Sequence, residues 1–547
     1  MPVADAPQEL LLTSLLSSDD IIDYVGPSLE RHRGCDLVDL NPGAGVWSQA
    51  LHRFLEPRKH IMMERDADLY QPFLKELLAK PSVEMINKSG VVWKELFEMM
   101  RTSLSQDEAS REETPQRNDT LLVTANLSMY PKKAFRSFDS VSTMVLYQFM
   151  SSIRHTSLFQ RYGLVRMLIW VNDDDKKRLL PRSLARRKRG AFEAEISCDW
   201  VHEICGKDLE TEDRMALRDE WMNLESAYDT AARMEEMGLK MPTGRETIMH
   251  RKIKSDPSLQ GQQLAGKHPP SLARPFKQEL EDLEAEQPKA TRRSRTTKNA
   301  DLPPRLKALR ARSKGETALG EQYLGLLQER DNLFALARSG GGRDSAAFRA
   351  ADAAWHESLD NLNKNQRNEF NMIHDNYHLF RQSPHALLWD RRAYEPLATA
   401  DTDFYPNAPT ALLDIQPKSM RAPFREFGPA TSRAGDMSDV MLRFWFSQTL
   451  LPVQQAMDSV WAGFGEQFAA CPGLTDVGTG GSPVEGRKVG AMRARCVNEA
   501  QWAEIMQAWM DWPFRPAYTQ MLGRLADESE AEADEEETKS GAVGVMI

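Results

Sequence analysis

The sequence predicts an α/β domain in which helices cover a parallel β-sheet. Residues 35–45, CDLVDLNPGAG, are apolar up to an acidic residue and end in a loop with two glycines. Such a run is typical of a buried parallel strand, and the glycines let backbone N–H groups approach a ligand where the next helix begins. Three further strand-like runs follow at helix-length spacing, which favours a parallel sheet with covering helices. They lie at residues 59–64, 82–87 and 120–125.

A nucleotide-binding role for the loop depends on Glu64, the last residue of the second predicted strand. A carboxylate at this place in nucleotide-binding α/β domains accepts hydrogen bonds from two ribose hydroxyls. Two simpler alternatives remain open. The glycines could serve only a tight strand-to-helix turn, and Glu64 could be an exposed acid at a strand end.

The fourth predicted strand runs into residues 126–130, NLSMY. Together with Glu64 and the acidic-x-x-Pro-Gly-x-Gly pattern that begins at Asp39, this motif resembles the ribosomal RNA adenine dimethyltransferases and their relatives, the mitochondrial transcription factors B. Residues 404–418, FYPNAPTALLDIQPK, resemble the Phe-x-Pro-x-Pro segment of that family, with one extra residue between the prolines. The resemblance covers about residues 15–205 and 400–425. It implies a Rossmann-like S-adenosylmethionine-dependent methyltransferase fold with a helical C-terminal domain and a large helical insertion.

In enzymes of this family S-adenosylmethionine lies over the glycine loop. The resemblance implies that Asp39 and the loop line its methionine end and that Glu64 holds its ribose. One departure lies after the third strand, where the family usually has an aspartate for the adenine and this chain has Lys88, Ser89 and Gly90. The candidate cofactor residues are Asp39, Asn41, Gly43, Gly45, Glu64, Ser89 and Asn126.

The family pattern after the fourth strand is Asn-Leu-Pro followed by an aromatic residue. There the Asn side chain and the Pro carbonyl accept hydrogen bonds from the target N6 amine, and the aromatic ring stacks on the flipped adenine. Here Ser128 replaces the proline, and Met129 takes the aromatic position unless Tyr130 does so after a one-residue shift. Proline fixes φ and aims its carbonyl, so its loss loosens the geometry of methyl transfer. The candidate catalytic residues are Asn126, Leu127, Ser128, Met129 and Tyr130.

We therefore interpret the cofactor pocket as retained or vestigial and the catalytic loop as degraded, as expected of a methyltransferase fold reused for binding. The simplest alternative for Asn126 is a turn residue after a strand.

The net charge of −10 argues against a protein that coats nucleic acid generally, but the charges are unevenly distributed. Residues 176–189, KKRLLPRSLARRKR, contain eight Lys or Arg and no acid. They follow a predicted strand at residues 165–171, beside the groove where the family holds nucleic acid, and we expect them to neutralise phosphates. The candidate nucleic-acid-binding residues are Lys176, Lys177, Arg178, Arg182, Arg186, Arg187, Lys188 and Arg189.

A chain of 547 residues is too long for one core, and we expect six parts. The polar stretch 250–304 suggests a flexible linker, residues 317–382 suggest two helices around 339–342, and residues 438–461 suggest a helix interrupted at Pro452. The parts are a methyltransferase-like domain (1–205), a partly disordered basic insertion (206–315), a helical hairpin (316–395), a return strand (396–430), a helical C-terminal domain (431–525) and an acidic disordered tail (526–547).

Five scattered cysteines form no Cys-x-x-Cys pair and no His-Glu-x-x-His occurs, so no metal is expected. No apolar run approaches the ~18 residues of a membrane span, so no membrane partner is expected. The first residues lack the Arg-rich character of a presequence. Placement in the mitochondrial matrix therefore rests on the resemblance.

Three functions remain in order of preference. The first is a mitochondrial transcription factor that helps mitochondrial RNA polymerase recognise and melt promoters by binding DNA. The second is an active S-adenosylmethionine-dependent enzyme that dimethylates adenine N6 in rRNA. The third is a dinucleotide-dependent oxidoreductase, which is disfavoured because Ser48 occupies the position of the third fingerprint glycine.

Overall fold

The computed structural model consists of two compact units, residues 1–419 and 420–547, and each is considered by itself. The described residues are 11–12, 15–110, 113–130, 133, 138–208, 218–285, 303–339, 342–405, 408–486 and 488–527.

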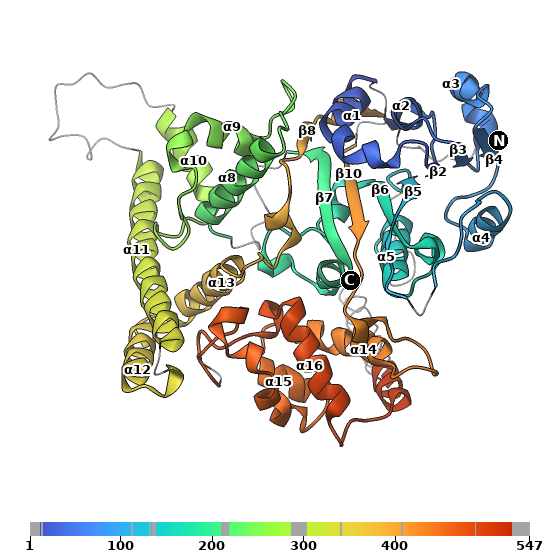
Figure 1. The fold of residues 1–547 in the computed structure, drawn as a ribbon. Helices are drawn as coiled ribbons and strands as arrows, with labels where there is room; N and C mark the ends of the chain where they lie inside the picture. Colours follow the sequence, from blue (N-terminus) through green and yellow to red (C-terminus); the bar gives the residue numbers. More distant parts are fainter. Residues whose placement is uncertain are drawn as a thin grey trace, which may run out of the picture. The chain divides into compact units, whose positions relative to one another are not determined.

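The first unit is built on an eight-stranded sheet with the order β4-β3-β2-β5-β6-β10-β7-β8 (Figure 1). Strands β2 to β6 are mutually parallel, whereas β10 is inserted antiparallel between β6 and β7. This order, with the last long strand reversed, is that of the Rossmann-like methyltransferases and confirms the predicted fold class. The strands are β2 (Asp36–Leu40), β3 (Lys59–Met63), β4 (Val83–Ile86), β5 (Arg117–Asn126), β6 (Leu164–Asn172), β7 (Cys198–Lys207), β8 (Leu397–Thr399) and β10 (Thr410–Pro417).

Both faces of the sheet are covered, which explains why its central strands read as continuous apolar runs. Successive side chains of a strand point to opposite faces, and those of β2 alternate between the two faces of the sheet. Val38 and Leu40 join one hydrophobic cluster, while Leu37 joins another. Helices α4 (Trp93–Thr102), α5 (Val141–Arg154) and α7 (Arg189–Ser197) contribute to the first cluster, and α1 (Leu15–Leu29) and α2 (Val46–Leu55) to the second. Helix α3 (Ala67–Leu78) packs beside β3 and β4 through Tyr70, Leu74 and Leu77.

A large helical insertion separates β7 from β8, as the resemblance implies. The expected linker at 250–304 is wrong over its described residues, because 250–285 include two helices with the buried side chains Ile253 and Phe276. The expected pair of helices at 317–382 is in fact three, because Asn363 caps a new helix. The insertion comprises α8 (Glu220–Glu236), α9 (Ile248–Ser255), α10 (Pro275–Ala285), α11 (Pro304–Arg338), α12 (Ala346–Asp360) and α13 (Lys364–Phe380).

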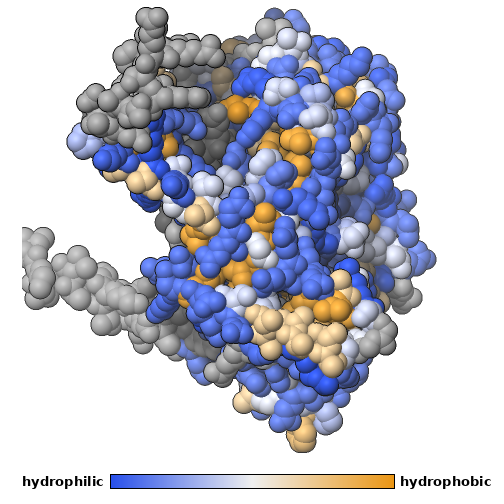
Figure 2. All heavy atoms as spheres, turned by 90° about the vertical axis from the view of Figure 1, so that its left-hand side faces the viewer, coloured by the Kyte–Doolittle hydropathy of each residue, from blue (hydrophilic) through white to orange (hydrophobic). Residues whose placement is uncertain are grey.

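Strand β9 (Phe404–Tyr405) pairs with β1 (Leu11–Leu12) just before the return strand β10. The face of the molecule in Figure 2 is mostly hydrophilic, and its apolar residues lie in limited patches.

The second unit is helical and is built around buried tryptophans. Helices α14 (Ala434–Ser447) and α15 (Val453–Val460) are separated at Pro452, which confirms the predicted interruption. Trp445 of α14 packs edge-on against Trp502 of α16 (Glu499–Asp511) with ring centroids 5.1 Å apart. These tryptophans therefore serve packing. The acidic tail lies outside the described residues from 528 onward, and no described helix is both long and apolar enough to cross a bilayer.

Candidate functional site

The glycine loop between β2 and α2 turns through the left-handed region of backbone space. Asn41, Gly43 and Gly45 have φ of 57°, 55° and 72°. Gly45 precedes α2, and a Cβ added to it would collide with the side chain of Leu74 in α3. At Gly45 the alternative of a purely steric role therefore holds, because a glycine there lets α2 begin close to α3.

Glu64 is fully buried, so the alternative of an exposed strand-end acid is wrong. Its two carboxylate oxygens accept hydrogen bonds from the backbone N–H groups of Gly43 and Asp66, each at 3.1 Å. Burial raises the pKa of Glu64 and these two hydrogen bonds oppose the rise. The carboxylate thus fastens the glycine loop to the end of β3.

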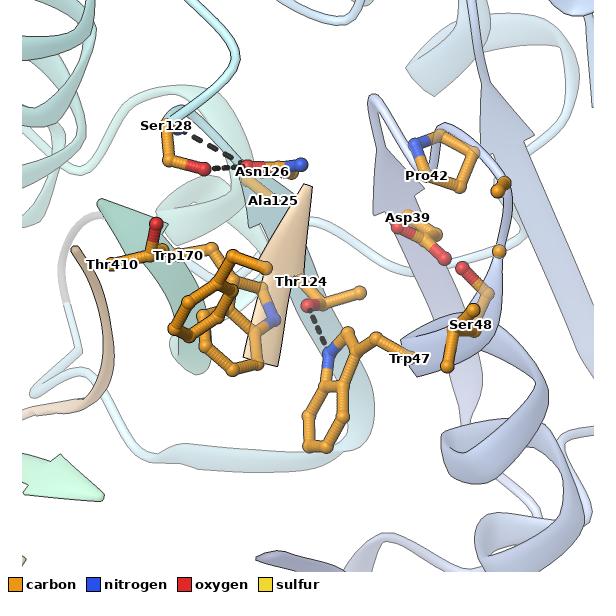
Figure 3. Close-up of a pocket in the computed structure, with 14 residues that line it drawn as sticks. Asp39, Pro42, Trp47, Ser48, Thr124, Ala125, Asn126, Ser128, Trp170 and Thr410 are labelled. Atoms are coloured by element: carbon orange, nitrogen blue, oxygen red, sulfur yellow. Dashed lines mark hydrogen bonds between the residues drawn. The ribbon is translucent and has the colours of Figure 1, made fainter. Parts of the chain in front are cut away.

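A pocket of about 480 Å³, partly open to solvent, lies where the carboxyl ends of β2, β5 and β6 meet the start of α2. Figure 3 shows Asp39, Pro42 and Ser48 on one wall and Asn126, Ser128 and Trp170 opposite. The lining also includes Ala44, Gly45, Val46, Trp47, Thr124, Ala125, Phe404 and Thr410.

Two buried polar atoms of the pocket residues have no hydrogen-bond partner: Asp39 Oδ2, an acceptor, and Trp170 Nε1, a donor. Asp39 and Trp170 are 2% and 4% exposed. The Asp39 carboxylate lies 3.5 Å from His60 Nε2, and Trp47 Nε1 donates a hydrogen bond of 3.0 Å to Thr124 Oγ1. The Asp39 oxygen nearest His60 is Oδ2 itself, and His60 Nε2 likewise has no other partner, so these two buried atoms face each other. Because buried polar groups are nearly always paired, the unpaired Trp170 Nε1 favours a ligand that offers an acceptor.

Asn126 is engaged by the residue that replaces the family's proline. Its Oδ1 accepts hydrogen bonds from Ser128 N at 3.1 Å and from Ser128 Oγ at 2.7 Å (Figure 3). Proline can donate neither bond. Asn126 therefore forms part of the turn after β5, and its Oδ1 accepts both bonds from Ser128.

The other residues of the NLSMY motif face different surroundings. Leu127 is fully buried in the core on one face of the sheet, and Met129 is half-buried. Tyr130 is not among the residues that line the pocket. Its ring packs beside that core, and burial raises the pKa of its hydroxyl to about 12.

The residues present fit only part of S-adenosylmethionine. Asp39, a carboxylate beside the glycine loop, suits the charged methionine end. The adenosyl part does not fit, because Glu64 is enclosed by backbone N–H groups and Ser89 N donates to Glu95 Oε2 at 2.6 Å. Lys88, in the position of the family's aspartate, pairs with Glu98 at 2.7 Å.

Two residues of the basic segment are interior ion-pair partners. Lys176 is 3% exposed, and its Nζ lies 2.5 Å from Asp173 and 2.6 Å from Glu203. Arg187 is 2% exposed, and its Nε donates to Glu195 at 3.0 Å. The prediction that these two bind phosphates is wrong, because their charges are buried and neutralised.

The rest of the segment divides between half-buried and exposed side chains. Arg189 pairs with Glu193 at 2.7 Å, and the Arg182 guanidinium lies 4.0 Å over the Trp389 ring. Arg178 and Lys188 are exposed, although Arg178 contacts Asp139. Lys177, which pairs with Asp174 at 3.1 Å, and Arg186 are half-buried. Acidic residues flank the segment closely, at 173–175, 193 and 195. They were the sequence signal that bases of the segment form ion pairs within the protein.

Sequence reasoning missed Trp47, Trp170 and Phe404 as pocket residues. Trp170 lies near the carboxyl end of a predicted strand, where ligands of open α/β sheets bind. The place of Trp170 at the end of a predicted strand was the sequence signal that could have identified it as a pocket residue. Phe404 lies far away in sequence and reaches the pocket only because β9 and β10 return to the sheet.

No protein-family model matches the chain. The chain is 24% identical over 154 residues to mitochondrial transcription factor 1 of Lachancea kluyveri and 25% identical over 149 residues to that of Saccharomyces paradoxus. These regions cover 28% and 27% of this chain but only 42% and 39% of the relatives. The matches confirm the resemblance to methyltransferase-like mitochondrial transcription factors.

A dimethyladenosine transferase from Plasmodium falciparum is a solved structure similar to this chain. It is 14% identical, and the alignment covers 50% of this chain and 88% of that chain with a TM-score of 0.24. A score this low adds nothing to the fold assignment, which rests on the strand order.

Proposed function

We propose that this protein is a mitochondrial transcription factor that assists mitochondrial RNA polymerase in promoter recognition and melting and binds DNA. The observation that carries the proposal is the similarity to curated mitochondrial transcription factors in a chain that folds as a methyltransferase. The Ser128 hydrogen bonds to Asn126 support it, because they occupy the acceptor that methyl transfer to adenine requires.

The pocket is suited to an unpaired base of a melted strand. Trp47, Trp170 and Phe404 line the pocket with aromatic rings that pack edge-on against one another, and they give it an apolar wall that can take a base. Trp170 Nε1 supplies one unpaired donor for a base edge. Arg178 and Lys188 would neutralise phosphates at the surface.

A second candidate is an active rRNA adenine N6-dimethyltransferase. The Asp39 carboxylate and the left-handed glycine loop favour it, since both suit the methionine end of S-adenosylmethionine. Weak binding of S-adenosylmethionine at residues 39–45 is the most that this arrangement supports.

Promoter-dependent transcription with a mitochondrial RNA polymerase, run beside a methyl-transfer assay on mitochondrial small-subunit rRNA, separates the two functions. We expect the purified protein to stimulate initiation and to transfer no methyl group. Robust dimethylation that disappears in Asn126→Ala would instead establish the enzyme. Failure to stimulate initiation on a linear promoter and on a premelted one would contradict the proposal.

A further inference from the structure

Asp39 connects the pocket to two buried histidines. Its carboxylate lines the pocket (Figure 3), and its Oδ2 lies 3.5 Å from Nε2 of His60, a residue of β3. His60 Nδ1 is hydrogen-bonded at 3.2 Å to Nδ1 of His52 on α2, and the two rings are stacked with centroids 5.4 Å apart. Asp39, His60 and His52 therefore form a continuous line of titratable groups that begins at the pocket.

The middle of this line is closed to solvent. His60 is fully buried, and neither its Nε2 nor Asp39 Oδ2 has another hydrogen-bond partner. His60 therefore gains or loses a proton only through its two neighbours. His52, which is 6% exposed, is the neighbour on the side away from the pocket.

The contacts determine where the protons lie when both rings are neutral. The bond between the two Nδ1 atoms needs one donor and one acceptor. A bare His60 Nε2 would set a lone pair against the Asp39 carboxylate, so His60 carries its proton on Nε2 and His52 donates from Nδ1. His52 thus selects the tautomer of His60, and His60 presents an N–H group to Asp39.

An added proton changes the charge beside Asp39 in two steps. Nε2 of His52 takes the proton from solvent, and the Nδ1 proton of His52 then passes to Nδ1 of His60. His52 is neutral again at the end, and His60 is an imidazolium whose Nε2–H faces the carboxylate. Burial lowers the pKa of His52 to about 4, which keeps the added charge off that ring.

Two other charged side chains of the described residues act on this line. Lys80, after α3, disfavours a positive charge on His52. Glu64 is near enough to Asp39 for the two acids to repel each other, which favours a cation beside Asp39. Both effects move the added charge from His52 towards His60.

We propose that His52 and His60 form a proton relay that sets the charge Asp39 presents to the occupant of the pocket. Without the added proton Asp39 presents a full negative charge, which suits a cation or a hydrogen-bond donor. With it, the pair of Asp39 and His60 is neutral overall. His60 acts through Asp39 and is a positioning residue. The relay goes beyond the proposed function and does not depend on which occupant the pocket has.

The test is long-range ¹H–¹⁵N correlation spectroscopy of the chain labelled with ¹⁵N-histidine, from neutral pH down to the onset of acid unfolding. His52→Gln and His60→Gln identify the two signals. We expect the neutral rings to carry their protons on different nitrogens, Nδ1 in His52 and Nε2 in His60, and both signals to change together as one proton is taken up. Two rings protonated on Nε2, two independent titrations, or no titration before unfolding would each overturn the proposal.

Asp39→Asn separates a relay linked to the pocket from two packed histidines. The variant keeps the shape and removes the negative charge, so the pair should lose its proton at a pH lower by about one pH unit or more. Asp68→Asn, at an exposed position in the first turn of α3, is the matched control and should leave the titration unchanged. The same midpoint in Asp39→Asn and the unaltered chain would contradict the link. If Asp39→Asn folds poorly, the tautomers of the unaltered chain decide the question.

Discussion

The exchange of one residue, proline to serine in the family pattern, changes what Asn126 can do. A serine adds a backbone N–H and a hydroxyl next to the asparagine oxygen, and both donate to it. A turn of this kind is a common use of asparagine after a strand. The family's substrate-binding side chain has thereby become part of the protein's own turn.

We predict that Asn126→Ala lowers the free energy of unfolding by about 1–2 kcal/mol, since it removes the acceptor of two hydrogen bonds. Asn126→Asp keeps the acceptor and should change stability much less. Asn87→Ala, at an exposed position after β4, is the control. Urea denaturation measures all three, and an aspartate variant as unstable as the alanine variant would contradict this account.

At the scale of elements, the basic segment shows that a run of basic residues in the sequence need not form a basic surface. Residues 176–189 contain no acid, yet Lys176 and Arg187 meet carboxylates from β7 and α7. A buried pair whose partner is removed leaves an uncompensated charge, which is strongly destabilising.

We predict that Arg178→Ala with Lys188→Ala weakens binding to single-stranded or bubble DNA of any sequence. The slope of log affinity against log salt should fall by roughly 0.7 per lost phosphate contact, about 1.4 in total. Arg187→Ala should instead lower stability, by about 3–5 kcal/mol, without a specific change in the salt slope. Fluorescence anisotropy and thermal denaturation provide the two measurements. An unchanged salt slope in the double variant would remove these residues from the DNA interface.

The junction of the glycine loop and α2 supports a second prediction at this scale. Gly45→Ala should cost about 2–4 kcal/mol of stability, because the residue has a positive φ and its Cβ would collide with Leu74. Gly325→Ala in α11 is the matched control, since nothing lies within 4 Å of its added Cβ. That change should stabilise by about 0.5–1 kcal/mol. Equal effects of the two substitutions in urea denaturation would refute the steric role of Gly45.

The sequence predicted those strands that are continuous apolar runs, and it predicted Asp39 and Asn126 within the site. Strand β7, CDWVHEICGK, was missed because it carries His202 and Glu203, whose polarity is balanced only by partners distant in sequence. The break between α12 and α13 was missed because a single capping asparagine makes it. Phosphate binding by Lys176 and Arg187 was wrong because the burial of both side chains depends on tertiary contacts, although the nearby acids signalled their pairing.

For the whole first unit, buried histidines determine how stability responds to acid. Burial is the largest cause that lowers the pKa of His32 and His202 to about 4. His202 Nε2 accepts the backbone N–H of Ala393 at 3.3 Å, which requires a neutral nitrogen. The folded state therefore binds protons more weakly at these residues than the unfolded state, whose histidines titrate near pH 6.5.

We predict that the first unit keeps its full stability above pH 6.5 and loses it as the pH falls from 6.5 towards 4. The two histidines contribute a fall of about 2.7 kcal/mol in the free energy of unfolding between pH 7.5 and 5.5. Buried Asp219, whose pKa burial raises to about 7, contributes with the opposite sign in this range. Urea unfolding followed by hydrogen exchange of the central strands measures the slope, and His202→Gln should make it shallower. An acid slope that is the same in His202→Gln as in the unaltered chain would refute the prediction.

The antiparallel insertion of β10 between β6 and β7 also sets an order of events during synthesis. Asp414 of β10 is aligned with Leu168 of β6 and His202 of β7, and its carboxylate pairs with the buried Arg166 at 2.6 Å. A ribosome that has made β7 must add about 200 further residues before β10 exists, which takes roughly 10–40 s at ~5–20 residues per second. Throughout that interval β6 and β7 have no strand between them, and Arg166 lacks its counter-charge. A nascent chain interrupted before residue 410 therefore presents two open strand edges, the kind of surface that chaperones bind and that otherwise pairs with other chains.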